Sequence, residues 1–378
     1  MRRAATATAL PVADQGLRVQ PRTGYRPQID GLRALAVVGV LMSHFWFARA
    51  QTGHLGVRLF FVISGFLITE RLLVARTAVD RGQAGRRGEL LWFFVRRALR
   101  ILPAYYALLL VLLIVDADGI RASAAWHVFQ LSNIWFALNQ AWTPWPIAHF
   151  WSLSIEEQFY LVWPWVILLV PMRHLRTAIW LTILIGIAFR FVVLATPLAD
   201  DAVAIWVLAP ASMDALGFGA LLAVTVRSGS VPRWVEQGAL SAALVWLAII
   251  YSLQVGWLAN RLVFSYALQD AISALVFTGL VARAHRNPSD GFGRALAFRP
   301  VVALGRISYG VYLYHLPVLA GVLTFIPQLD YGPQRFAICA PVTIMIAALS
   351  WIAMERPLVG MKRHLADETA VAHGSGER

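Results

Sequence analysis

An arginine and a histidine lie eleven residues apart in the apolar stretch from Asp30 to Phe47. At about 100° per residue, eleven steps amount to about three helical turns, so Arg33 and His44 share one face of the predicted helix. They lie roughly 16 Å apart along its axis, about half the hydrocarbon thickness of a membrane. An imidazole at that depth can accept a proton, and ionisable groups inside a span are functional candidates by default. The alternative is an arginine that reaches the lipid headgroups and a histidine that bonds a neighbouring helix.

Arg97 and Arg100 form a second candidate site, at the predicted cytoplasmic end of a span. Residues three apart are neighbours on a helix face, so the two guanidiniums would project together. Planar guanidiniums make a fork that is suited to phosphate. Arginines beside a span can instead merely orient it in the membrane, and this pair alone does not separate the two roles.

Two adjacent carboxylates, Glu156 and Glu157, lie at the predicted mouth of a span. Ser154 with Glu157 fits the S-x-x-E capping box, so a role in capping a helix fits these two residues at least as well as a catalytic one. Glu156 then has no local structural role, and it could pair with an arginine such as Arg58. Ser152 could act as a covalent nucleophile, although the sequence places no base beside it.

A polar stripe lies in a late apolar segment. Arg306, Tyr309 and Tyr312 fall on one helical face, and Ser308, Tyr312 and His315 on an adjoining one. Such a stripe can line a cavity or tie helices together, and helix packing is the simpler role for the tyrosines. The sequence has no His-Glu-x-x-His, cysteine pair or P-loop, so neither a metal site nor nucleotide hydrolysis is predicted.

The composition indicates which elements must position these groups. Of the 378 residues, 59% are hydrophobic, and the mean hydropathy is +0.63; soluble domains are about 45–50% apolar. We therefore predict an all-α fold, a polytopic membrane bundle of about ten transmembrane helices. The predicted spans are 30–47, 56–74, 102–115, 151–171, 177–195, 203–224, 237–254, 264–284, 303–325 and 336–354.

The net charge of +13 comes almost entirely from arginine. Most arginines fall in loops that this arrangement places inside, which is the positive-inside pattern and removes the need for a nucleic-acid partner. The predicted location is the plasma (inner) membrane, with a flexible cytoplasmic tail over 1–29, a membrane domain over 30–357 and a cytoplasmic tail over 358–378. Residues 116–150, rich in tryptophan, are predicted to form an extracytoplasmic cap with a re-entrant or interfacial helix. The single cysteine, Cys339, permits no intrachain disulfide.

Five motifs occur along the chain in an order that resembles membrane acyltransferase family 3. They are Arg33-x10-His44, Gly56 to Ile68, Arg97-x-x-Arg100, Trp151 to Tyr160 and Ile307 to His315. The resemblance covers Tyr25 to Pro357. It implies a ten-helix membrane fold that transfers an acyl group, usually acetyl, from acyl-CoA to carbohydrate hydroxyls of the cell envelope. Some members carry a fused esterase-like domain; we expect none here, because only a short tail follows Pro357.

The residues and the resemblance together predict a mechanism. Arginines would hold the phosphates of acetyl-CoA or another acyl-CoA, and an imidazole would take a proton from the acceptor hydroxyl as it attacks the thioester. An imidazole with the ordinary pKa of about 6.5 is largely neutral at physiological pH, as this role requires. The predicted groups are His44, Arg33 and Glu156 for catalysis, Arg97 and Arg100 for the donor, and Arg58, Trp151, Tyr309 and His315 for the acceptor.

Two other functions fit the same sequence. The acceptor could be a sugar on a macrolide-type antibiotic instead of a cell-envelope glycan. Alternatively, the chain could be a permease for glycans or lipids, in which the ionisable groups line a path across the membrane. The acyltransferase prediction requires a small-molecule acyl donor, a carbohydrate or glycosylated acceptor and membrane lipids as partners, with no metal.

Overall fold

The computed structural model describes residues 25–47, 51–196, 203–229, 233–254 and 267–357. Within the fourth range, the side chains of residue 234 and residues 249–254 are not described. The predicted tails, 1–29 and 358–378, therefore lie almost entirely outside the described residues. Wherever the chain is described, it forms helices and connecting turns without a β-strand, as an all-α membrane protein requires.

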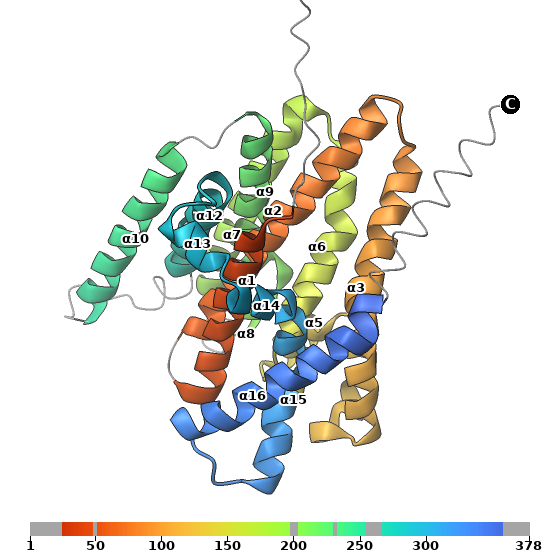
Figure 1. The fold of residues 1–378 in the computed structure, drawn as a ribbon, viewed down its shortest axis with the longest axis vertical. Helices are drawn as coiled ribbons and strands as arrows, with labels where there is room; N and C mark the ends of the chain where they lie inside the picture. Colours follow the sequence, from red (N-terminus) through yellow and green to blue (C-terminus); the bar gives the residue numbers. More distant parts are fainter. Residues whose placement is uncertain (1–24, 48–50, 197–202, 230–232, 255–266, 358–378) are drawn as a thin grey trace, which may run out of the picture.

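The first half of the chain forms long helices with a set of short ones between them (Figure 1). The order is α1 (Pro27–Leu41), the π-helix η1 (Met42–Trp46), α2 (Thr52–Asp80), α3 (Arg86–Ile114), η2 (Ala117–Ser123), α4 (Ala124–Val128), α5 (Ser132–Asn139), η3 (Trp145–Ile147), α6 (Phe150–Leu169) and α7 (Met172–Leu194). The second half contains α8 (Val203–Val207), η5 (Ala209–Ser212), α9 (Met213–Arg227), α10 (Arg233–Gln254), α12 (Gln269–Arg286), α13 (Gly291–Leu296), α14 (Arg299–Arg306), α15 (Ser308–Phe325), α16 (Pro333–Ser350) and η7 (Trp351–Glu355).

Among the described residues, five helical segments are long and apolar enough to cross a membrane. They are Pro27–Trp46, Arg86–Ile114, Met172–Leu194, Ala209–Arg227 and Pro333–Glu355. A sixth results if α14 and α15, which meet at a bend of 67°, count as one broken span. The chain is thus a multi-pass membrane protein, and the count of about ten spans stays a prediction.

Glycine permits the close helix contacts of the bundle. A Cβ on Gly65 of α2 would clash with the Leu216 carbonyl of α9, and one on Gly219 would clash with the Val62 carbonyl of α2. Small residues let helix backbones approach in this way in membrane proteins. Gly305 of α14 lies equally close to the Asp30 backbone of α1. These contacts hold α1, α2, α9 and α14 together at the centre of the molecule (Figure 1).

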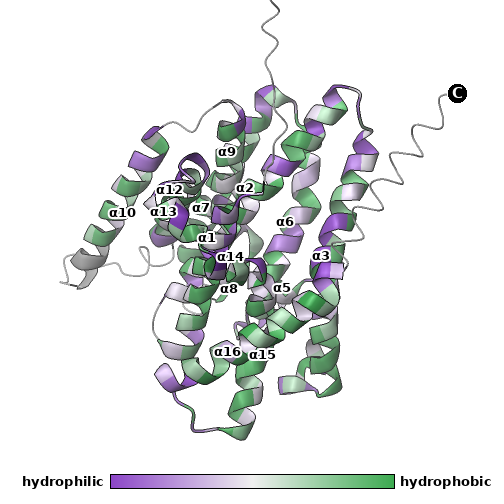
Figure 2. Ribbon diagram, in the orientation of Figure 1, coloured by the Kyte–Doolittle hydropathy of each residue, from purple (hydrophilic) through white to green (hydrophobic). Residues whose placement is uncertain are grey.

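Two local predictions differ from the structure. The third helix begins at Arg86 instead of residue 102, so Arg97 and Arg100 lie inside a continuous helix instead of in the connection before it. The predicted capping box is wrong: α6 begins at Phe150, and Ser154 lies one turn inside it with a buried hydroxyl that has no hydrogen-bond partner among the described residues. Figure 2 shows hydrophilic bands on α3, α6 and α14 within largely hydrophobic helices, and these bands surround the site described next.

Candidate functional site

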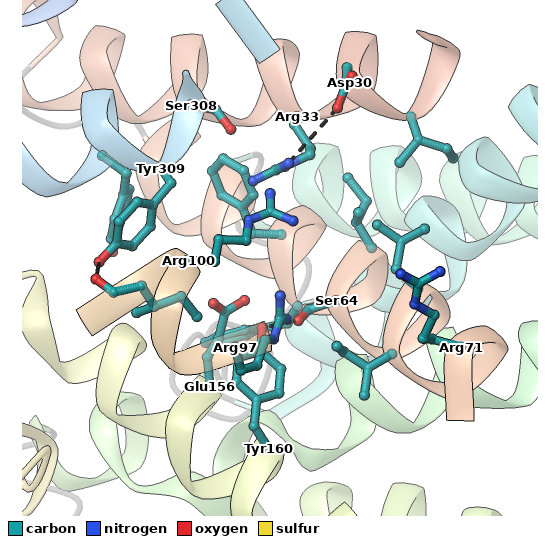
Figure 3. A pocket seen from close by; sticks show the side chains of 18 of the residues that line it. Asp30, Arg33, Ser64, Arg71, Arg97, Arg100, Glu156, Tyr160, Ser308 and Tyr309 are labelled. Atoms are coloured by element: carbon teal, nitrogen blue, oxygen red, sulfur yellow. Dashed lines mark hydrogen bonds and ion pairs between the residues drawn. The ribbon is translucent and has the colours of Figure 1, made fainter. Parts of the chain in front are cut away.

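A cavity of about 880 Å³ lies among α1, α2, α3, α6 and the broken pair α14–α15. Its lining is strongly basic, with seven arginines against three carboxylates. Figure 3 shows side chains from these helices pointing into it. The charged residues that line it are Arg26, Arg33, Arg71, Arg96, Arg97, Arg100, Arg306, Asp30, Glu70 and Glu156. Such a lining favours an anionic ligand.

Part of this positive charge is compensated within the protein. Arg26 pairs with Glu70 at 3.1 Å. The Asp30 carboxylate is shared by two weaker pairs, with Arg33 at 3.8 Å and with Arg306 at 3.9 Å. The acidic first turn of α1 thus holds the guanidiniums of α1 and α14 at the rim of the cavity.

Four further arginines have no carboxylate within 4.0 Å in the part of the chain that the structure describes. These are Arg71 of α2 and Arg96, Arg97 and Arg100 of α3. The Arg97 guanidinium lies over the ring of Tyr160, 3.8 Å from its centroid, and its buried Nε has no hydrogen-bond partner. Cation–π stacking fixes the plane of a guanidinium without neutralising its charge. The cavity therefore holds uncompensated cations in an orientation that an anion can use.

The structure brings several predicted site residues together in this cavity. Arg33, Arg97, Arg100, Glu156 and Tyr309 all line it. Figure 3 shows the Glu156 carboxylate directed from α6 toward the arginines. The Tyr309 hydroxyl donates a hydrogen bond of 2.8 Å to the Ile101 carbonyl, so it also ties α15 to α3.

Arg58 takes a different position, away from the cavity. It is fully buried and pairs with Asp214 at 2.8 Å and, more weakly, with Asp270 at 3.7 Å. Arg190 pairs with the other oxygen of Asp214 at 2.6 Å. The expected pairing of Arg58 with Glu156 is wrong, because two carboxylates from α9 and α12 already occupy that guanidinium. Its predicted role in substrate binding stays a prediction.

His44 lies in the π-helix η1, outside the lining of the cavity. The estimate that places it on the stripe of Arg33 assumes a regular α-helix, and a π-turn changes the phase of the last turn. Its ring contacts that of His315, with 4.9 Å between centroids. The Nδ1–H of His44 donates to the Val40 carbonyl at 3.0 Å, which leaves Nε2 as the nitrogen with a lone pair.

His149 joins this cluster, and sequence reasoning gave it no role. It directly precedes α6, and its ring lies 4.7 Å from that of His315 and 5.3 Å from that of Tyr312, measured between centroids. Nothing in the spacing of His149 links it to the late apolar segment, so only tertiary packing reveals the contact. Trp151 is buried with its ring edge toward Phe61 and does not line the cavity.

Tyr312 and Ser152 separate the cavity from the histidine cluster. Both line the cavity, and their hydroxyl oxygens lie 2.6 Å apart. The Ser152 hydroxyl also donates to the His149 carbonyl at 3.1 Å. Among the described residues, no imidazole nitrogen bonds to Ser152, so the base that a serine nucleophile needs does not contact it. The tyrosine ring, in contrast, contacts His149 and His315 directly.

The described residues contain no group of three or more His, Cys, Asp or Glu side chains that could hold a metal ion. The histidine cluster is thus arranged for contact between rings and backbone carbonyls. The chemistry that this geometry offers is anion binding by arginine, together with proton transfer by imidazole.

Comparisons with known proteins also indicate an acyltransferase. The chain is 30% identical to the peptidoglycan O-acetyltransferase OatA of Listeria monocytogenes and 31% identical to the putative peptidoglycan O-acetyltransferase YrhL of Bacillus subtilis. It is 28% identical to O-acetyltransferase OatA of Staphylococcus aureus. Each match covers 88% of this chain but only 56%, 55% and 57% of the respective relative, so the chain spans little more than half of their length. No solved structure matches it. The acyltransferase-domain family model matches residues 26–355, and the chain therefore belongs to membrane acyltransferase family 3.

Proposed function

We propose that this protein transfers an acyl group, most simply acetyl, from acyl-CoA to a hydroxyl group of a carbohydrate. The observation that carries the proposal is the cavity with four arginines that have no carboxylate partner within 4.0 Å among the described residues. Relatives whose names specify peptidoglycan O-acetylation support a carbohydrate acceptor. Family membership supports acyl transfer.

The donor fits the charge of the cavity. Coenzyme A carries a pyrophosphate and a further phosphate on its ribose, and guanidiniums bind phosphates through short, charge-assisted hydrogen bonds. Arg97 and Arg100 would hold these phosphates, with Arg71 as a third cation on the facing helix. The arginine distribution predicts that this end of α3 faces the cytoplasm, where acyl-CoA is available.

His44 is the proposed general base. The thioester arm would extend from the cavity past Tyr312 and Ser152 to reach His44, where the acceptor hydroxyl would lose its proton to His44 Nε2 while its oxygen attacks the thioester carbonyl. The new C–O bond forms, the C–S bond breaks, and the coenzyme A thiolate leaves. Arg33 and Glu156 line the same cavity as Tyr312 and Ser152, and we propose that they orient the thioester arm. A thioester is activated enough for this direct attack.

The experiment uses the full chain in proteoliposomes, with labelled acetyl-CoA on one side and peptidoglycan fragments or simpler glycans as acceptors. Acetylated glycan should appear, as detected by mass spectrometry, only when acetyl-CoA is present. His44→Ala and His44→Gln should lose about 10²–10⁴-fold in rate, the usual contribution of a general base, while they retain acyl-CoA binding. Glycan movement that does not depend on acetyl-CoA would instead support the permease. Transfer at parental rates by both variants would remove the role of His44.

A further inference from the structure

Three histidines from distant parts of the chain meet behind the cavity wall. His44 comes from η1, His149 from the residue before α6, and His315 from the middle of α15. The centroid of His315 lies 4.9 Å from that of His44 and 4.7 Å from that of His149. His315 is therefore the central ring of the cluster.

Backbone carbonyls fix the tautomer of each ring. His44 Nδ1 lies 3.0 Å from the Val40 oxygen, His149 Nε2 lies 3.0 Å from the Leu313 oxygen, and His315 Nδ1 lies 2.5 Å from the Tyr312 oxygen. A carbonyl oxygen only accepts hydrogen bonds, so each of these nitrogens carries the hydrogen of a neutral imidazole. The other nitrogen of each ring then holds a lone pair.

Two of these lone pairs accept no hydrogen bond. Nδ1 of His149 and Nε2 of His315 are buried and have no hydrogen-bond partner in the described part of the chain. A buried polar atom without a partner costs free energy, and in a native protein it calls for an explanation. The cluster thus contains two basic nitrogens without a partner, on rings that contact one another.

Among the described residues, no carboxylate forms an ion pair with an imidazole of this cluster. Titratable or charged groups on the elements around it include Tyr312 of α15, His54 of α2, Glu156 of α6, and Arg335 and Cys339 of α16. His54 is engaged with Asp270 at 2.6 Å, and Arg335 donates to the Leu329 carbonyl. A proton that enters the cluster can therefore be shared among the imidazoles, whose rings contact one another.

We propose that His44, His149 and His315 act as one unit that stores a single proton during acyl transfer. This inference rests on the proposed function. The acceptor O–H bond breaks, the proton moves to Nε2 of His44, and an N–H···N hydrogen bond to His315 spreads the positive charge. When the C–S bond breaks, the thiolate recovers this proton and leaves as coenzyme A thiol, so the cluster ends the cycle neutral. Like-charge repulsion opposes a second proton.

The position of the cluster fits this role. Tyr312 contacts His149 and His315 with its ring and faces the cavity with its hydroxyl, which bonds to Ser152. The proton store is thus one side chain away from the cavity, from which the thioester arm would extend to His44. His149 and His315 would act on the reaction only through His44, as positioning residues for its proton.

The structure allows variants that delete a basic nitrogen and keep the structural hydrogen bond. In His315→Asn, the side-chain amide can still donate to the Tyr312 carbonyl as Nδ1 does. In His149→Gln, the longer amide can donate to the Leu313 carbonyl as Nε2 does. We expect kcat to fall roughly 10- to 100-fold in each variant, which is a smaller loss than in the His44 variants, while KM for acetyl-CoA stays unchanged. The acid limb of the pH–rate profile should move to lower pH, because the shared proton is held less tightly.

His127→Gln is the matched control. His127 is a buried histidine of the short helix α4, and both of its ring nitrogens are 2.9 Å from serine hydroxyls, Ser123 and Ser132. Burial lowers the pKa of His127 to about 4, so it does not titrate near neutral pH. This variant can lose stability, but its acid limb should match that of the parent.

The outcomes separate the two proposals. If the parent protein transfers no acetyl group, the proposed function fails. If the parent is active and both cluster variants keep its kcat and its acid limb, the proton store fails and the histidines only pack. Should a variant not fold, nitrogen-15 histidine NMR of the parent in detergent decides: the cluster should take up one proton well before a second, whereas three independent titrations would overturn the proposal.

Discussion

Two groups of arginines lie within this bundle, and they differ in how their charge is compensated. Arg58 and Arg190 are completely buried, and both bind the carboxylate of Asp214 at 2.8 and 2.6 Å. Arg97 and Arg100 border a cavity and have no carboxylate within 4.0 Å among the described residues. Arginine thus occurs in this bundle both with and without a carboxylate partner.

The difference indicates function because an uncompensated charge inside a membrane protein is costly. In the first group, carboxylates from α9 and α12 supply the compensation, and the ion pairs join α2, α7, α9 and α12. In the second group, Glu156 lies in the same cavity but forms no ion pair within 4.0 Å, so a bound anion can supply further counter-charge. A phosphate-bearing ligand is the simplest source, which is why the paired arginines are expected to control stability and the unpaired ones binding.

The largest effect is expected from Asp214→Ala. This change leaves Arg58 and Arg190 with no shared carboxylate in a buried site, and breaking a buried pair typically costs 3–5 kcal/mol. The melting temperature in detergent should fall sharply. It can be measured by size-exclusion chromatography after heating. Asp214→Asn keeps the shape and should still lose much of the stability. A melting temperature equal to that of the parent would show that the buried network does not support the fold.

Arg97→Ala and Arg100→Ala should produce the opposite pattern. Each removes a charge-assisted hydrogen bond to phosphate worth about 1.5–3 kcal/mol, so the affinity for coenzyme A should fall roughly tenfold to a hundredfold. Stability should be unchanged or higher, because the loss of one guanidinium reduces the repulsion between neighbouring positive charges. Isothermal titration with coenzyme A and the same heating assay measure both quantities.

Arg294→Ala is the control for those variants, since it removes the same charge from an exposed position on α13, outside the cavity lining. Its affinity for coenzyme A should match that of the parent. Equal binding by Arg97→Ala, Arg100→Ala and Arg294→Ala would mean that the arginines of α3 only orient the helix in the membrane.

A smaller effect is expected for Arg97→Lys. Lysine keeps the charge but cannot form the planar fork or stack flat on Tyr160, where the arginine lies 3.8 Å from the ring centroid. The affinity for coenzyme A should therefore lie between those of the parent and Arg97→Ala. Full recovery with lysine would show that charge alone matters at this position.

Cys339→Ser should have the smallest effect, because this residue lies in α16 and belongs to neither arginine group. Transfer activity should stay close to that of the parent, and an inactive but folded variant would revive a thioester intermediate on the cysteine. The same background permits labelling of Asn139→Cys, an exposed position near the end of α5. Labelling from outside intact cells is expected; labelling only after lysis would contradict the topology and place the arginine cavity on the other side.

Local spacing predicted much of the cavity. Arg97 and Arg100 lie one turn apart on a helix, as their spacing predicts, and both line the cavity. Periodicity did not orient Glu156, and it favoured helix packing for Tyr309, although both also line the cavity. The family resemblance then brought these motifs into one site. The all-α membrane fold followed from composition alone.

Contacts between distant segments could not be predicted in this way. Asp214 and Asp270 are isolated carboxylates in apolar helices, and no pattern in the sequence indicates that both meet Arg58. His149 reaches His315 only because α6 and α15 converge. The π-turn that redirects His44 depends on packing against α2 and α16, which helical periodicity does not describe.

The bend of 67° between α14 and α15 also affects the electric field inside the bundle. A continuous helix would carry its N-terminal end away to the membrane surface. The break instead begins α15 at Ser308, which lines the cavity with Tyr309, so the first amide groups of an 18-residue helix border that space. Aligned peptide dipoles give a helix N-terminus about half an elementary positive charge. This backbone potential persists whatever side chains line the cavity, so even a variant without the arginines of α3 should retain some attraction for anions.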